Sequence, residues 1–188
     1  MVEPMDDAEL RAQLEALHTE SFGWALQCAR RDAAEAEAVL QAVYLKVLDR
    51  RARYNERSSL KTWLFAVIKN TASERRRRRA LHLLRLVRYE DAPAITDGRA
   101  ESGLYDSELQ QLFVQALGLL PARQREVLQL VFYHDMSLAD AASVMKVSIG
   151  SARTHYDRGK KRLREGLLES GAFNEFRSRR KPYPEAVL

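Results

Sequence analysis

The segment from Ser58 to Arg79, SSLKTWLFAVIKNTASERRRRR, constrains the fold of this chain more than any other stretch. Its apolar side chains recur at the three- and four-residue spacing of a helix, and five consecutive arginines follow without a break. A run of arginines is usually solvated and often disordered, but this run continues a helix that has an apolar face to pack. We therefore expect an ordered helix whose basic end lies against nucleic acid, with a solvated helix end as the alternative. The apolar positions are Leu60, Trp63, Leu64, Val67, Ile68 and Ala72.

The rest of the chain also favours helices. It has only 8 glycines and 5 prolines, and no run alternates between apolar and polar residues as a half-buried strand does. We predict an all-α fold, with a first helix over 7–30 and a second over 33–51. Further helices are predicted from about residue 59, and over 104–117 and 121–133. The exposed side of the second helix is predicted to bear Glu35, Glu37, Gln41 and Lys46.

Helical periodicity fails over residues 91–103, which contain one proline, two glycines and three acidic residues. A chain of 188 residues is long enough for two small domains. We predict one small helical domain at 7–90, a short linker at 91–103, and a second small helical domain at 104–168. Residues 169–188 form a polar tail, for which a disordered end and a regulatory docking segment are both open.

The charges are segregated along the chain. The net charge is +5, yet residues 1–48 have nine acidic side chains against four basic ones. Two later segments are basic: residues 69–79 have six basic side chains against one acidic, and residues 137–168 have seven against three. Two separate basic segments favour an acidic partner such as nucleic acid.

The composition argues against several other classes of protein. The single cysteine, Cys28, excludes an internal disulfide and fits a reducing compartment. The four histidines are scattered without metal-ligand spacing, so we expect no metal and no cofactor. No apolar run approaches the ~20 residues that a membrane helix needs, and the first residues show no basic region followed by an apolar one, so we expect no signal peptide. We expect a soluble cytoplasmic protein that makes no membrane contact.

The second basic segment has the pattern of a helix-turn-helix. Ser137 can cap a short helix, SLADAASVM, and Ser148 can cap a longer one, with a turn at Lys146 and Val147 between them. Lys146 stands where such turns often carry glycine, and a left-handed backbone there costs about 1 kcal/mol. At ~100° per residue, the longer helix has one apolar face, formed by Ile149, Ala152, Tyr156, Gly159 and Leu163.

The opposite face of the longer helix is basic and rich in hydrogen-bonding groups. In the major groove an arginine pairs well with guanine, and a carboxylate accepts from cytosine. Other lysines and arginines nearby are expected to hold phosphates. The alternative is an amphipathic hairpin with a solvated face. The residues expected to contact DNA are Ser151, Arg153, Thr154, Asp157, Arg158 and Lys161.

In this order, the segments resemble a bacterial RNA polymerase sigma factor of the extracytoplasmic-function (ECF, group IV) type of the sigma-70 family, over about Leu10 to Leu168. The helix by which that family binds core polymerase resembles AEAEAVLQAVYLKVL, and the helix that melts and reads the minus-ten element resembles SSLKTWLFAVIKNTASERRRRR. The domain that reads the minus-thirty-five element resembles LLPARQREVLQLVFYHDMSLADAASVMKVSIGSARTHYDRGKKRLRE. The resemblance implies two helical domains, of sigma region 2 and region 4 type.

The resemblance also implies roles for single residues. A flipped-out base needs an apolar or aromatic wall and an amide that reads its edge, which suits Trp63 and Asn70; core packing is the alternative for Trp63. The sequence departs from the family at Ala38 and Ala42, where acids are common, and at Glu74, where aspartate is usual. The implied contacts with core polymerase are Glu35, Glu37, Gln41 and Tyr44, and those with the minus-ten element are Leu60, Trp63, Lys69, Asn70, Arg75 and Arg76.

The implied function is promoter-specific transcription initiation by a protein that is not an enzyme and that binds core RNA polymerase and promoter DNA. An anti-sigma factor is implied as a further partner by the resemblance only. A second interpretation is a helix-turn-helix regulator of the response-regulator type, because that family's output domain also resembles LPARQREVLQLV followed by such a motif. A phosphoreceiver would add alternating strands and helices, which are not evident. A nucleic-acid-processing enzyme would need clustered carboxylates or a His/Lys constellation, and no such cluster is visible.

Overall fold

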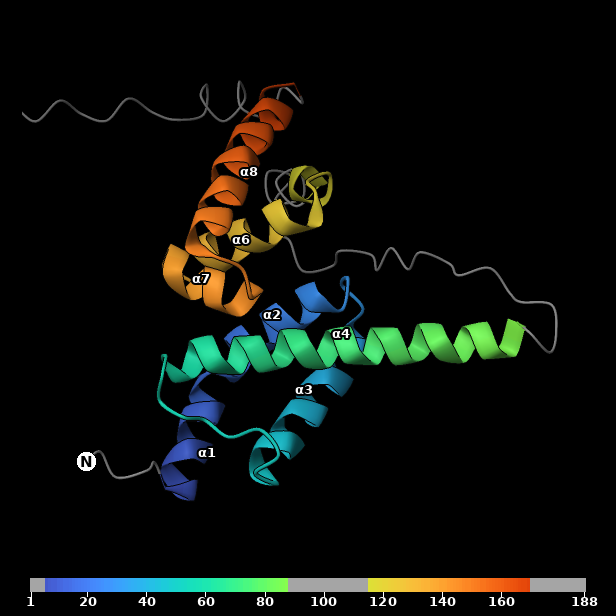
Figure 1. Ribbon diagram of the computed structural model, residues 1–188, viewed down its shortest axis with the longest axis vertical. Helices are drawn as coiled ribbons and strands as arrows, with labels where there is room; N and C mark the ends of the chain where they lie inside the picture. The colour runs from blue at the N-terminus through green and yellow to red at the C-terminus, as the bar shows by residue number, and fades with distance from the viewer. Residues whose placement is uncertain (1–5, 88–114, 170–188) are drawn as a thin grey trace, which may run out of the picture. The chain divides into compact units, whose positions relative to one another are not determined.

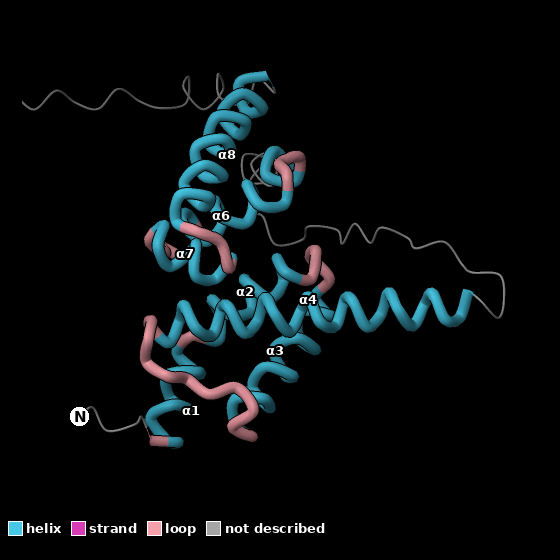
Figure 2. Tube along the Cα trace, viewed as in Figure 1, coloured by secondary structure: helices cyan, strands magenta, loops and turns pink. Residues whose placement is uncertain are grey.

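A computed structural model of the chain describes residues 6–87 and 115–169. Every regular element in these two ranges is an α-helix (Figure 2), which confirms the predicted all-α fold. The contacts divide the chain into two compact units, residues 1–100 and 101–188. The predicted linker, most of the helix predicted over 104–117 and nearly all of the predicted tail lie outside the described residues.

The first unit contains four helices, α1 (Asp7–Ala16), α2 (His18–Cys28), α3 (Ala33–Leu48) and α4 (Leu60–Val87) (Figure 1). Helices α2, α3 and α4 pack on one another, and the end of α4 extends beyond the two helices that it crosses. None of the helices in the described ranges is long and apolar enough to cross a membrane.

The single helix predicted over 7–30 is instead two helices that meet at Leu17. The backbone of Leu17 has ψ 0°, which turns the chain while the hydrogen bonds from Leu17 N–H to Gln13 O and from Ser21 N–H to Leu17 O are kept. The turn lets α2 bury Ser21, Trp24 and Ala25, whereas the preceding helix buries only Leu14. Burial of the α2 face therefore decides where the helix breaks.

The core of the first unit is centred on Trp24, which is 1% exposed. Its indole Nε1–H donates to the carbonyl oxygen of Phe65 at 3.0 Å, and the two rings stack with centroids 5.8 Å apart. Val39 and Val43 of α3 and Leu64 and Ile68 of α4 are buried with them, as the helical spacing predicts.

Polar side chains mark where α3 and α4 begin. Asp32 Oδ1 accepts from the Glu35 backbone N–H at 3.0 Å, and Ser59 Oγ accepts from the Thr62 backbone N–H at 3.1 Å, so each residue satisfies a donor that the first helical turn leaves unpaired. Helix α3 ends three residues before the predicted limit because Arg50 is left-handed, with φ 56°. Helix α4 continues through all five arginines, which confirms that they project from an ordered element.

The second unit contains α6 (Ala122–Phe132), α7 (Leu138–Met145) and α8 (Ile149–Glu169), each of which packs on the other two. Ser137 Oγ accepts from the Asp140 N–H and Ser148 Oγ from the Ser151 N–H, both at 3.1 Å, as caps of α7 and α8. Lys146 is left-handed, with φ 56° and ψ 49°. The predicted helix-turn-helix, with its turn at Lys146, is therefore confirmed, and the structure shows that the turn uses the left-handed backbone.

One residue of the predicted apolar face of α8 is not covered. Ala152, Gly159 and Leu163 are buried, but Ile149 remains 52% exposed. Ile149 is the first residue of the helix, and periodicity predicts the direction of a side chain but not how far its neighbours extend.

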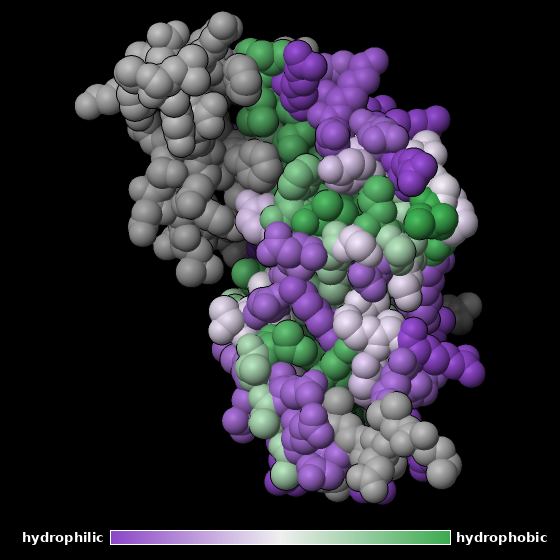
Figure 3. Space-filling model, turned by 90° about the vertical axis from the view of Figure 1, so that its left-hand side faces the viewer, coloured by the Kyte–Doolittle hydropathy of each residue, from purple (hydrophilic) through white to green (hydrophobic). Residues whose placement is uncertain are grey.

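On the face drawn in Figure 3, hydrophobic groups lie among hydrophilic residues. The large exposed hydrophobic residues are Leu45, Leu48, Leu81, Leu119, Phe132, Tyr133, Ile149 and Leu168.

Candidate polymerase and nucleic-acid interfaces

The four residues of α3 predicted to contact polymerase do not share one surface. Glu37 and Gln41 are exposed, and the half-buried Tyr44 lies near them, with its hydroxyl 3.0 Å from His18 Nδ1. Burial raises the pKa of the Tyr44 hydroxyl. At ~100° per residue, Glu35 lies about 160° around the helix from Glu37, and only 11% of its side chain is exposed.

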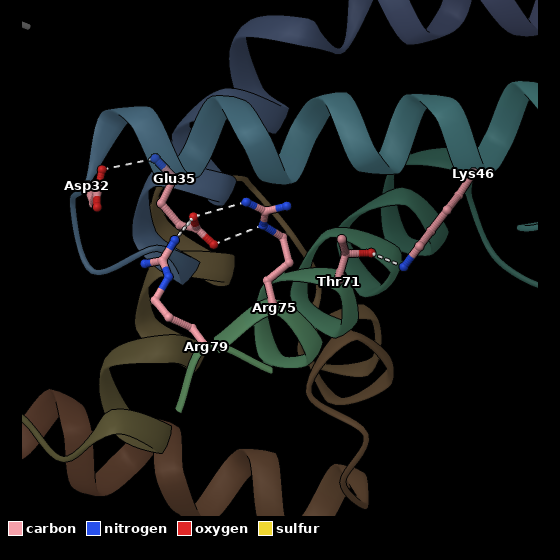
Figure 4. Close-up of polar contacts among 6 residues, drawn as sticks. All are labelled: Asp32, Glu35, Lys46, Thr71, Arg75 and Arg79. Carbon is pink, nitrogen blue, oxygen red and sulfur yellow. Dashed lines mark hydrogen bonds and ion pairs between the residues drawn. The ribbon is translucent and has the colours of Figure 1, made fainter. Parts of the chain in front are cut away.

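Glu35 instead faces α4 and binds two arginines (Figure 4). Arg75 Nε donates to Glu35 Oε1 at 3.0 Å and Arg75 Nη2 donates to Oε2 at 3.2 Å, while Arg79 Nη2 also donates to Oε2. The hydrogen bond from Arg75 holds the pKa of the Glu35 carboxyl below its ordinary value, and that bond raises the pKa of Arg75. The prediction that Glu35 lies on the exposed side of its helix is therefore wrong, because two residues 40 and 44 positions later cover it.

A second polar cluster joins the same two helices nearer the end of α3. Lys46 Nζ donates to Thr71 Oγ1 at 3.1 Å and to Glu74 Oε2 at 3.0 Å (Figure 4 shows the contact with Thr71). Glu74 also pairs with Arg78 on its own helix. The hydrogen bond from Lys46, with the charges of Lys46 and Arg78, lowers the pKa of the Glu74 carboxyl. Lys46 was predicted to be exposed, but it is half-buried because it reaches across to α4.

The residues predicted to contact the minus-ten element all lie on α4, but with different exposure. Leu60 is buried, Trp63 and Lys69 are half-buried, and Asn70 is exposed. Arg76 is exposed as well, whereas Arg75 faces Glu35.

Trp63 has an aromatic neighbour, Tyr54, that was not predicted from the sequence. The Tyr54 ring lies 5.4 Å from the Trp63 ring at an angle of 51°, and the Tyr54 hydroxyl donates to the Ser58 carbonyl oxygen at 2.6 Å. Tyr54 comes before the helix, so no helical periodicity links it to Trp63. The only signal in the sequence is an aromatic residue within a polar connecting segment.

The residues predicted to contact the minus-thirty-five element are all brought together on the first turns of α8, and all are exposed. Two hydroxyl groups there also make local bonds: Ser148 Oγ donates to Ser151 Oγ at 2.9 Å, and Thr154 Oγ1 donates to the Gly150 carbonyl oxygen at 3.0 Å. The four charged members project from a helix that the turn and the cap hold in place; they are Arg153, Asp157, Arg158 and Lys161. This arrangement can present donors and an acceptor to the edges of base pairs.

No group of three or more histidine, cysteine, aspartate or glutamate side chains in the described ranges has an arrangement that suits a metal ion.

Comparison with known proteins accounts for both units. Residues 15–81 match the family Sigma-70 region 2, and residues 110–163 match Sigma-70, region 4. The chain is 31% identical over 144 residues to the RNA polymerase sigma factor CarQ of Myxococcus xanthus, which covers 74% of this chain and 78% of CarQ. It is 28% identical over 142 residues to the ECF RNA polymerase sigma factor EcfG of Rhodopseudomonas palustris, covering 75% and 76% of the two chains.

A solved structure agrees with these matches. The sigma factor RpoE from Bartonella quintana, determined with the anti-sigma factor NepR, superposes with a TM-score of 0.65 at 25% identity, covering 85% of this chain and 97% of RpoE. Both family matches occur in the predicted order along the chain. The chain therefore belongs to the extracytoplasmic-function sigma factors of the sigma-70 family, which act with RNA polymerase in promoter-directed transcription.

Proposed function

We propose that this sigma factor directs core RNA polymerase to promoters of two elements, with α8 reading the minus-thirty-five element and α4 capturing the strand that opens at the minus-ten element. The observation that carries the proposal is that two separate units each present an exposed polar and basic helix, one through Asn70 and Arg76 and one through Arg153 to Lys161. The corresponding domains are 7–90 and 104–168, with a linker at 91–103 and a tail at 169–188.

Strand capture follows from the chemistry of α4 and the segment before it. An unstacked base can stack on an aromatic ring, which contributes roughly 1–3 kcal/mol per base, and the Tyr54–Trp63 pair offers such rings. The exposed amide of Asn70 has both a donor and an acceptor for a base edge. Binding of this kind stabilises the open strand, so the protein needs no catalytic group and the polymerase performs the chemistry.

Binding of core polymerase is proposed for the exposed side of α3. Glu37 and Gln41 lie there, and Leu45, one turn further along, is 61% exposed. An apolar side chain beside polar ones matches the apolar centre and polar rim of protein interfaces. Leu45 was not predicted as a contact from the sequence. The protein is proposed to work in the cytoplasm with the polymerase.

An anti-sigma factor is proposed as a further partner. The support is the structure of RpoE from Bartonella quintana, which was solved in complex with the anti-sigma factor NepR.

Run-off transcription tests the proposed function. Purified chain and core RNA polymerase are incubated with a pool of genomic promoter fragments, and start sites are mapped with and without the chain. Selective start sites that depend on the chain are expected. If the chain forms no complex with core polymerase and selects no start sites, the proposal is wrong.

A further inference from the structure

The five consecutive arginines of α4, Arg75 to Arg79, do not all face the same side of the helix. Arg75 and Arg79 both donate to the carboxylate of Glu35, which is only 11% exposed (Figure 4). Arg76 and Arg77 are exposed, and neither makes an ion pair or a hydrogen bond within residues 6–87 and 115–169. The run is therefore not one uniform basic surface.

Helical geometry aligns the two outward arginines with the predicted base-reading amide. At ~100° per residue, Asn70, Ser73, Arg76 and Arg77 fall within about 120° of one another, and Arg75 lies outside that range. All four are exposed; we name them the outer strip. From Asn70 to Arg77 the strip extends about 10 Å along the axis, so one face carries an amide, a hydroxyl and two cations.

We infer that Glu35 is a positioning residue that divides the arginine run, so that Arg76 and Arg77 contact DNA phosphates beside the base read by Asn70 while Arg75 and Arg79 are held on α3. The inference rests on the proposed function, because it assumes that α4 contacts promoter DNA. It moves Glu35 away from the predicted polymerase contacts and Arg75 away from the predicted DNA contacts.

The physical reason is the cost of exchanging partners. If Arg75 and Arg79 moved to a phosphate, the largely buried Glu35 carboxylate would lose its charged hydrogen-bond donors, and an unpaired buried charge is strongly unfavourable. Arg76 and Arg77 break no hydrogen bond or ion pair to a described residue when they meet a phosphate. The two-point geometry of the Arg75–Glu35 contact adds to this preference.

The salt dependence of DNA binding tests the inference, because each phosphate contact lowers the slope of log K against log salt concentration by about 0.9 on duplex DNA. Holoenzyme reconstituted with each variant is titrated with a promoter fragment selected in the run-off assay. Arg76→Gln and Arg77→Gln are each expected to make the slope shallower by about 0.9. Arg75→Gln, the same change one residue away, is expected to leave the slope unchanged.

Glu35→Gln is expected to change the salt-dependence slope in the opposite direction to Arg76→Gln and Arg77→Gln. Loss of the negative charge releases Arg75 and Arg79, and the slope is expected to become steeper, by up to about 1.8 if both arginines reach phosphates. Glu15→Gln is the matched control, since Glu15 is an exposed residue of α1 outside every proposed site, and it is expected to leave the slope unchanged. Circular dichroism of each variant checks the fold.

Equal slopes for Arg75→Gln and Arg76→Gln would overturn the inference, because the run would then act as an undivided basic surface. An unchanged slope for Arg76→Gln and Arg77→Gln would also overturn it, even if the variants at 35 and 75 do not fold. Failure of the proposed function looks different: the unmodified holoenzyme would then select no promoter at all.

Discussion

At the scale of single residues, Lys146 and Asn70 occupy positions that cost stability. Lys146 holds a left-handed backbone between α7 and α8, a conformation that suits glycine better than any residue with a Cβ atom. Asn70 lies within a helix, where its short amide is a poor helix former, and yet it is exposed on α4. Lys146 forms the turn between α7 and α8, and Asn70 is proposed to hydrogen-bond to a base.

Replacing Lys146 with glycine is expected to stabilise the second unit by about 1 kcal/mol, because the strain of the left-handed backbone is removed. Chemical denaturation of the full chain measures the change. Lys146→Ala removes the same charge but keeps the Cβ atom, so it should give no such gain. A glycine variant no more stable than the alanine variant would contradict the strain at this turn.

Asn70→Ala is expected to slow open-complex formation about tenfold, which corresponds to the loss of about 1.4 kcal/mol of base recognition. Binding to core polymerase should be unchanged, because Asn70 lies on α4 and the proposed polymerase contacts lie on α3. Permanganate reactivity of unstacked thymines reports the opening, and native gel mobility reports core binding. Normal opening on the chain's own promoter would count against a base-reading role.

At the scale of elements, the crossing of α6 and α8 and the pairing of α3 with α4 position the proposed DNA-contacting faces. A Cβ atom at Gly159 of α8 would lie 3.1 Å from Leu128 Cδ1 and 3.3 Å from the Gln124 carbonyl oxygen, which belong to α6. The backbone oxygen cannot move without disturbing its helix, so this glycine permits the close approach. The pairing of α3 with α4 combines buried apolar side chains with the ion pairs of Glu35 to Arg75 and Arg79.

Gly159→Ala is expected to destabilise the chain by about 1 kcal/mol, because crowding of roughly 1–3 kcal/mol exceeds the helix-propensity gain of about 1 kcal/mol. Gly166→Ala is the matched control on the same helix: nothing lies within 4 Å of its Cβ position, so only the propensity gain of about 1 kcal/mol remains. Denaturant unfolding should give opposite signs for the two variants. The same sign at both sites would disprove the close crossing.

The stability of the α3–α4 pair is expected to fall in acid. The pKa of the Glu35 carboxyl is lowered from 4.5 by Arg75 in the folded chain. The contribution of the ionised carboxylate to the free energy of unfolding is therefore complete above the unfolded pKa, and it is lost as the pH falls through the folded pKa. The difference in free energy of unfolding between wild type and Glu35→Gln should be constant from neutral pH to about 5 and shrink below it. A difference that does not depend on pH would exclude the ion pair as its source.

At the scale of the whole molecule, promoter recognition is proposed to be shared by two units, each with its own core and its own DNA-contacting helix. Free-energy effects of changes at distant sites without shared partners usually add to within about 0.5 kcal/mol. Asn70 and Arg158 belong to different units.

The double variant Asn70→Ala, Arg158→Ala is therefore expected to lose the sum of the two single effects on the rate of open-complex formation, within about 0.5 kcal/mol. Arg158→Ala alone should relax preference in the minus-thirty-five element at a cost of roughly 1–3 kcal/mol. Promoter titrations with the wild type, the two single variants and the double variant form a double-mutant cycle, which gives the coupling free energy between the two sites. A coupling above about 1 kcal/mol would mean that the two units do not read DNA independently.

The sequence by itself determined the all-helical fold, the caps at Ser137 and Ser148, the position of the turn at Lys146 and the order of the two sigma regions. These features depend on residues within four positions of one another or on motifs read in sequence. It could not predict the break at Leu17, the exposure of Ile149 or the contact between Tyr54 and Trp63, because each depends on which surfaces meet. Only the tertiary structure decided that Glu35 faces Arg75 and Arg79, since a charge separated from its partners by 40 residues has no local signature.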